Sequence, residues 1–158
     1  MKKVLILGGG GFIGGHLVKK LVSQENWVRS VDQKAHEYGA KASEFILGDL
    51  SDASFVTKVF DLPDSEVFDE VYQLAADMGG AGYIFSGEND AQVMYNSATI
   101  NLNVLNEIRT RNLLNNKNKT KVFYSSSACI YPAEIQRDPQ NPGLKESDAY
   151  PANPDSEY

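Results

Sequence analysis

The sequence contains few of the side chains that bind metals or form disulfides. Its 158 residues include one cysteine, Cys129, and two histidines, His16 and His36. A single cysteine cannot form an internal disulfide, and these side chains form no cluster with the ligand spacing of a zinc site. We therefore expect no bound metal and a reducing compartment, with the cytoplasm as the default.

Long hydrophobic runs and a surplus of positive charge are also missing. The longest apolar runs are the length of one strand, as at residues 4–7, whereas a membrane-spanning helix needs about 20 apolar residues. The N-terminus shows no basic and apolar leader of the secretory type. With 15 basic and 21 acidic residues, the formal net charge is −6, which disfavours binding to phosphate backbones. We expect neither a membrane nor a nucleic acid partner.

The hydrophobic pattern that is present predicts alternating strands and helices. A hydrophobic content of 42% and a charged content of 23% are typical of one globular domain. Strands are expected at residues 3–8, 27–32, 44–47, 67–74 and 121–125. Apolar residues at helical spacing predict helices that begin near residue 12, at 51–60 and at 90–114, with residues 77–82 and those after 125 as loops. This order indicates an α/β fold with a doubly wound parallel sheet whose strands are buried on both faces.

A run of glycines separates the first expected strand from the first helix. Residues 8–11 and Gly14 satisfy both GxxGxxG and GxGxxG, so the spacing does not choose between these two patterns. A backbone without Cβ atoms can approach a pyrophosphate, and a helix N-terminus offers it N–H groups. We predict that Gly8, Gly11, Phe12, Ile13 and Gly14 bind a dinucleotide. The alternative is a glycine turn that holds no ligand.

Two acidic residues lie at the carboxyl ends of the next two strands. Asp32 closes the second strand 18 residues after Gly14, close to the position from which a carboxylate binds the adenosine ribose. A carboxylate there favours NAD over NADP, although Lys34 is near and a solvated strand-end aspartate is the alternative. Asp49 follows the third strand, where it either binds the adenine amine or caps the next helix.

Several motifs resemble one enzyme family along the whole chain. They are the glycine turn, Asp32 and residues 48–50, 74–76 and 125–131. Together they resemble the extended short-chain dehydrogenases/reductases, in particular the NAD-dependent sugar epimerases and dehydratases. The resemblance implies a Rossmann NAD-binding domain over residues 1–158. It also implies that Leu50, Leu74, Ala75 and Ala76 lie beside the NAD cofactor.

Residues 74–80, 126–132 and 144–149 resemble one branch of this family, which inverts C3 and C5 of GDP-mannose. In that chemistry the sugar is oxidised at C4, epimerised and reduced again. The resemblance implies that Ser127 binds the oxygen at C4, that Tyr158 is the acid/base for the oxidation and that Cys129 is an acid/base for epimerisation. Gly79 would touch the nucleotide-sugar substrate. The alternative is that Cys129 is a small hydrophobic residue buried in the core.

The sequence departs from the family pattern at two places. Where the family has an asparagine near the start of the long helix, this chain has Asn96 followed by Ser97. The chain also ends at Tyr158, where the family motif Tyr-x-x-x-Lys begins, so that lysine, the last strands and the substrate domain are absent from it. A phenol with a pKa near 10 needs a nearby cation to act as a base at neutral pH. The expectation is a cofactor-binding fragment with little turnover.

Two other functions remain open. A nucleotide-sugar 4-epimerase or 4,6-dehydratase shares the oxidation at C4 and does not need Cys129. A non-catalytic NAD-binding module needs neither Cys129 nor the missing lysine. Related enzymes often form dimers through the long helix and the helix that starts at Tyr158, and the second of these is missing here. The resemblance therefore offers a homodimer but leaves the oligomeric state open.

Overall fold

A computed structural model describes residues 1–37, 39–63, 66–84, 86–115, 119–127, 130–137, 139–140, 144–151 and 153. The chain divides into two compact units, Met1–Tyr124 and Ser125–Tyr158. The first unit contains the sheet and the larger helices, and the second contains short helical turns. Each unit is described by itself.

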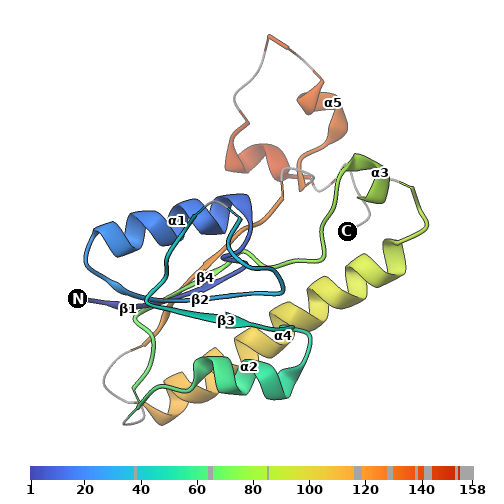
Figure 1. The fold of residues 1–158 in the computed structure, drawn as a ribbon. Coiled ribbons are helices and arrows are strands. Elements are labelled where there is room, and N and C mark those ends of the chain that lie inside the picture. Colours follow the sequence, from blue (N-terminus) through green and yellow to red (C-terminus); the bar gives the residue numbers. More distant parts are fainter. Residues whose placement is uncertain are drawn as a thin grey trace. The chain divides into compact units, whose positions relative to one another are not determined.

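The first unit is a parallel five-stranded sheet with the order β3-β2-β1-β4-β5. The strands are β1 (Lys3–Leu7), β2 (Trp27–Asp32), β3 (Glu44–Leu47), β4 (Glu70–Gln73) and β5 (Lys121–Tyr124). The helices are α1 (Phe12–Ser23), α2 (Ala53–Phe60), α3 (Ala81–Ile84) and α4 (Asp90–Leu114). Helix α1 covers one face of the sheet, and α2 and α4 cover the other (Figure 1). This arrangement confirms the predicted doubly wound sheet.

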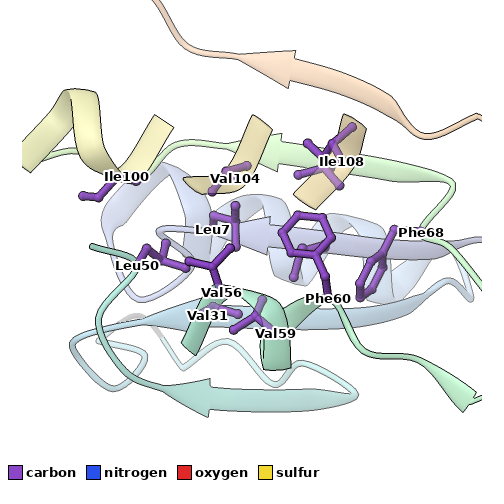
Figure 2. Close-up of a cluster of buried hydrophobic side chains, with 12 residues drawn as sticks. Leu7, Val31, Leu50, Val56, Val59, Phe60, Phe68, Ile100, Val104 and Ile108 are labelled. Atoms are coloured by element: carbon purple, nitrogen blue, oxygen red, sulfur yellow. The ribbon is translucent and has the colours of Figure 1, made fainter. Parts of the chain in front are cut away.

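Alternate residues of the central strand supply the two hydrophobic cores. Leu5 and Leu7 belong to the larger core, on the face that α2 and α4 cover. Figure 2 shows Leu7 among the side chains that these two helices contribute. Val4 and Ile6 point to the opposite face and pack with α1 residues such as Val18. Because β1 is buried on both sides, its sequence reads as a continuous apolar run.

The strand order reverses on either side of β1, which fixes where a ligand site can form. Leu7, the last residue of β1, pairs with Val31 of β2 on one side and with Gln73 of β4 on the other. The chain leaves β1 and β4 toward opposite faces of the sheet, so the loops after them diverge. Ligands of open α/β sheets bind in the crevice at this point.

The bounds of four elements differ from the sequence-based prediction. Two strands differ by a single residue, because β1 ends at Leu7 and β5 ends at Tyr124. The strand expected at residues 67–74 spans only Glu70–Gln73, because the ladder begins where Asp69 bonds to Lys3 through both its backbone and its side chain. Helix α2 begins at Ala53 and not at residue 51, because Asp52 is its N-cap. The Asp52 carboxylate accepts hydrogen bonds from the backbone N–H groups of Ser54 and Phe55, at 2.8 and 3.3 Å.

The edge of the sheet and the C-terminal segment also differ from expectation. All four residues of β5 are exposed, including Phe123 at 52%, so burial on both faces holds for β1 and not for this edge strand. The second unit, expected to be a loop, contains α5 (Ala133–Gln136) and a 3-10 helix (Glu146–Ala149). Elements of a single turn are too short to show a helical period. Along the described part of the chain, no helix is long and apolar enough to cross a bilayer.

A buried arginine joins β2 to the end of α2. The Arg29 side chain is 8% exposed, and its Nε lies 2.7 Å from Glu44 Oε2. Its Nη1 donates to the carbonyls of Val59 and Asp61, both at 2.7 Å, at the C-terminal end of the helix. Two aromatic rings lie 5.4 Å from its guanidinium carbon, those of Trp27 and Phe68. The guanidinium therefore satisfies acceptors that the last turn of α2 leaves unpaired.

Candidate functional site

A cavity of about 600 Å³ lies at the carboxyl ends of the strands in the first unit. Its walls are the loops after β1, β2, β3 and β4, together with the first half of α4. Eight residues that the sequence pointed to line this cavity: Gly8, Gly11, Asp32, Asp49, Leu50, Leu74, Ala75 and Ala76. The structure thus brings together residues up to 68 positions apart in the chain.

Of the five glycines in the turn, only Gly11 has room for a Cβ atom. Gly8 has a φ of +86°, and a Cβ there would lie 2.9 Å from the backbone of Leu74 and Ala75. A Cβ on Gly14 would collide with the backbone of Gly8 and Gly9. A Cβ on Gly11 would meet nothing nearer than the Gly8 carbonyl, at 3.7 Å. Gly8 and Gly14 are therefore required by packing, whereas Gly11 leaves room at the cavity wall.

Helix α1 begins directly after this turn. Gly11 is its N-cap, and Phe12 and Ile13 form its first turn with side chains 63% and 67% exposed. These two side chains and Gly14 are not among the residues that line the cavity. The first N–H groups of a helix have no partner inside the helix, so this end is suited to an anion.

Asp32 fastens the end of β2 to the glycine turn. Its Oδ2 accepts a hydrogen bond from the Gly10 backbone N–H at 2.9 Å, and its Oδ1 accepts one from Lys34 at 3.0 Å. A Cβ on Gly10 would lie 2.9 Å from Asp32 Cγ, so the two segments are in close contact. The carboxylate therefore lies on the cavity wall in a fixed orientation.

The turn after β3 places Asp49 in the cavity wall. Asp49 Oδ1 accepts a hydrogen bond from the Ser51 backbone N–H at 2.8 Å. The helix cap, one of the two roles open for Asp49 from the sequence, belongs to Asp52 instead. The backbone hydrogen bond from Ser51 lowers the pKa of the Asp49 carboxyl.

This lowered pKa predicts a pH-dependent stability of the β3–α2 turn. A carboxyl whose folded pKa lies below its unfolded value stabilises the fold above the unfolded pKa, about 3.9 for Asp, and that contribution is lost as the pH falls through the folded pKa. We expect the side-chain carboxyl carbon of Asp49 to titrate below the ordinary Asp value in an NMR pH series. A midpoint at or above that value contradicts the hydrogen bond to Ser51.

The loop after β4 carries an acidic side chain that the sequence did not single out. Asp77 Oδ2 accepts a hydrogen bond from Asn96 Nδ2 at 2.7 Å, and its Oδ1 accepts one from the Tyr83 hydroxyl at 3.2 Å. Its backbone N–H donates to Ser97 Oγ at 3.2 Å. Burial and the Asp77 charge raise the pKa of Tyr83. Asn96 and Ser97, the pair at which the sequence departs from the family, thus hold Asp77 at the cavity.

Gly79, expected to touch a substrate, lies against Tyr83. A Cβ on Gly79 would come within 2.7 to 2.8 Å of the Tyr83 side chain, whereas one on Gly80 would meet nothing within 4 Å. The sequence could not reveal this contact because residues 77–82 read as an unstructured glycine loop. The absent side chain at position 79 makes room for the ring that contacts Asp77.

Replacing Gly79 with alanine is therefore expected to displace the Tyr83 ring and loosen α3. The Ile84 amide, which donates to the Gly80 carbonyl in this turn, should exchange about tenfold faster with solvent deuterium, as for a loss of about 1.4 kcal/mol. Gly80→Ala is the matched control and should leave exchange within about twofold. Equal exchange in the two variants would show that the Tyr83 contact does not hold this loop.

The three residues expected to carry the chemistry belong to the second unit. Ser127 is exposed, and its carbonyl accepts a hydrogen bond from the Ile130 backbone N–H at 3.4 Å. Cys129 and Tyr158 lie outside the described residues. Their roles stay predictions.

The parallel sheet and the helices on its two faces define a Rossmann-like α/β protein, and the comparisons identify the family. A sequence model of the NAD dependent epimerase/dehydratase family matches residues 4–158. The chain belongs to this family.

Relatives with assigned activities fall within the same group. GDP-mannose 3,5-epimerase of Arabidopsis thaliana is 38% identical over 159 aligned residues, which cover 99% of this chain and 39% of that protein. UDP-glucose 4-epimerase of Lactobacillus helveticus is 32% identical, over 82% of this chain and 36% of that protein. The chain thus spans about two fifths of the length of these relatives.

Solved structures show the same fold. A crystal structure of UDP-glucose 4-epimerase superimposes with a TM-score of 0.74 and 30% identity, over 96% of this chain and 41% of that one. The UDP-glucose 4-epimerase of Brucella ovis, solved in complex with NAD, gives a TM-score of 0.73 at 23% identity, over 98% of this chain and 42% of that one.

Proposed function

We propose that the cavity of the first unit binds NAD. Three observations support this. Gly11 leaves open space beside the N-terminus of α1, where a pyrophosphate would be held by backbone N–H groups. Asp32 presents a fixed carboxylate for the hydroxyls of the adenosine ribose. The loops after β3 and β4 form the remaining walls. When bound, NAD supplies a hydride acceptor for the reversible oxidation of an alcohol.

The same carboxylate favours NAD over NADP in this proposal. A 2′-phosphate would place negative charge beside Asp32, whose two oxygens are already oriented by Gly10 and Lys34. Lys34 also lines the cavity, and its positive charge opposes this preference, while its backbone N–H donates to the Asp32 carboxylate.

We further propose that the chain is the cofactor-binding part of a nucleotide-sugar epimerase that acts on GDP-mannose. The observation that carries this proposal is the 38% identity to a GDP-mannose 3,5-epimerase over 99% of the chain. Relatives with lower identity include UDP-glucose 4-epimerases, so a 4-epimerase is the second candidate. Both reactions begin with oxidation at C4 of the sugar.

In this proposal three side chains of the second unit act on the sugar. The Ser127 hydroxyl binds the oxygen at C4, and the Tyr158 phenolate accepts the proton of that hydroxyl group. The resulting ketone acidifies the hydrogens at C3 and C5. A free cysteine thiol has a pKa near 8.5, so about a few per cent of such a thiol is thiolate at neutral pH. Cys129 would remove a proton from C3 or C5 in that form.

The direct test is solvent deuterium incorporation into GDP-mannose, followed by NMR, with the longest natural form of the protein and added NAD. We expect label at C3 or C5. Cys129→Ser should abolish the exchange, because a serine hydroxyl does not ionise near neutral pH. Conversion of UDP-glucose at C4 that Cys129→Ser leaves unchanged would favour the 4-epimerase. Binding of NAD without either reaction would favour a non-catalytic NAD-binding module.

A further inference from the structure

Two asparagines flank the buried stripe of α4. Ile100, Val104 and Ile108 of this helix point into the larger core (Figure 2). At about 100° per residue, Asn101 and Asn103 fall on opposite sides of that stripe. The helix therefore presents one amide toward β4 and the other toward the turn between β3 and α2. Both asparagines are half-buried and adjoin the core.

Asn103 bonds to two neighbouring carbonyls of the β3–α2 turn. Its Nδ2 donates to the Leu50 carbonyl at 3.1 Å and to the Ser51 carbonyl at 2.9 Å. Since an amide nitrogen has two N–H groups and no acceptor, this side chain uses both donors here. Only the NH₂ group can face two carbonyls, so the orientation of the amide is fixed by its partners.

The turn that Asn103 holds is a wall of the cavity. Leu50 and Ser51 line it together with Asp49, whose carboxylate is held by the Ser51 N–H. Asn103 thus holds the carbonyls of Leu50 and Ser51, and the Ser51 N–H in turn orients the Asp49 carboxylate. Leu50 is itself 4% exposed in the core beside α4, so the turn cannot move without disturbing these bonds.

The opposite wall has a comparable connection to the same helix. Gln73 is 3% exposed, and its Nε2 donates to Asn101 Oδ1 at 2.8 Å and to the Ala75 carbonyl at 2.9 Å. Asn101 therefore reaches the loop after β4 through Gln73, whereas Asn103 reaches the turn after β3 directly. Helix α4 fixes both loops on either side of the cavity.

We propose that Asn103 is a positioning residue for the adenosine half of the bound dinucleotide. By holding the Leu50 and Ser51 carbonyls it sets the place of Asp49 and Leu50, against which the adenine would lie. The proposal rests on the proposed binding of NAD. Asn103 lies on α4, 53 residues after Leu50 in the chain. The proposal therefore gives this helix a part in the affinity for adenosine phosphates.

The test measures the affinity of the chain for AMP, by calorimetry, in two variants of this residue. Asn103→Asp keeps the size of the side chain and points carboxylate oxygens at two carbonyls, which repel them. Asn103→Ala removes both hydrogen bonds without that repulsion, so it serves if the aspartate variant fails to fold. We expect the Kd for AMP to rise about tenfold or more for Asn103→Ala, as for the loss of two hydrogen bonds.

Two control variants on the same helix separate positioning from general destabilisation. Asn106→Asp makes the same change of charge at an exposed asparagine whose contact is with Arg109. Ile108→Val lowers the melting temperature through the core, away from the cavity walls. Both should bind AMP within about twofold of the unaltered chain at a temperature where all are folded.

The outcomes distinguish this inference from the proposed function. If the unaltered chain binds neither AMP nor NAD, the proposed function fails, and this inference fails with it. If the unaltered chain binds AMP and folded Asn103→Ala binds it equally well, only the positioning role is overturned. An equal loss of AMP affinity in Ile108→Val also overturns it, because the effect would then follow stability alone.

Discussion

Replacing Gly8 with alanine is expected to destabilise the first unit by about 3 kcal/mol or more. The backbone at Gly8 has a φ of +86°, a conformation that alanine adopts only with strain. The added methyl group would also lie 2.9 Å from backbone atoms of Leu74 and Ala75, which cannot turn away as a side chain can. Chemical denaturation followed by circular dichroism measures the loss.

Gly11→Ala is the matched control for this prediction. No atom lies nearer than 3.7 Å to the place of its methyl group, so the free energy of unfolding should change by less than about 1 kcal/mol. The methyl group would occupy the space beside the α1 N-terminus, and NAD binding should be lost in calorimetry. Unchanged NAD affinity in Gly11→Ala would contradict the proposed position of the pyrophosphate.

Arg29→Ala is expected to cost about 3 to 5 kcal/mol, because it removes a nearly buried guanidinium that packs between two aromatic rings and leaves two carbonyls at the end of α2 without a donor. A domain of this kind has about 5 to 15 kcal/mol of total stability, so the variant should be close to unfolding at 37 °C. The urea midpoint of unfolding, at an unchanged slope, measures the effect.

Glu44→Gln tests whether Arg29 stabilises the fold mainly through its ion pair with Glu44 or through its hydrogen bonds to carbonyls. The Glu44 side chain is 41% exposed, and glutamine retains an acceptor for Arg29 Nε. We expect a loss below about 1 kcal/mol, as for other exposed ion pairs. If Glu44→Gln and Arg29→Ala cost the same, the ion pair, and not the contacts with Val59 and Asp61, is the main contribution.

The sheet was predictable because its central strands are buried on both faces. Residues 3–8 and 27–32 read as short apolar runs that end in glycines or an aspartate. The second strand has the predicted bounds, and the first ends one residue earlier, at Leu7. The long helix at 90–114 was also found, from its buried residues at three-to-four spacing. In these segments local pattern and tertiary burial favour the same conformation, so the sequence alone was sufficient.

The exposure of β5 and the start of β4 were not predictable in the same way. Val122 and Phe123 have the composition of a buried strand, but their position at the sheet edge leaves them exposed. The start of β4 depends on Asp69 meeting Lys3, a pairing between residues 66 apart. A pattern read in a window of about ten residues cannot include both partners of such a long-range contact.

The residues of the candidate site show the same contrast between local sequence pattern and long-range contacts. The glycine turn, Asp32 and Asp49 were identified because each follows a strand that the hydrophobic pattern located. The groups that hold these loops, such as Asn103 and Tyr83, were missed because polar residues on a helix or in a glycine-rich loop read as solvent-exposed. Their partners are carbonyls and a carboxylate from other elements, which only the fold brings near.

The strand order has a consequence for the order of events during synthesis on the ribosome. Strand β1 pairs with β2, 24 residues later, and with β4, 66 residues later. At about 5 to 20 residues per second, the second neighbour of β1 is made about 3 to 13 seconds after β1 itself. Until then, one edge of the most apolar strand in the chain has no partner, and this nascent segment is the one that a chaperone would be expected to bind.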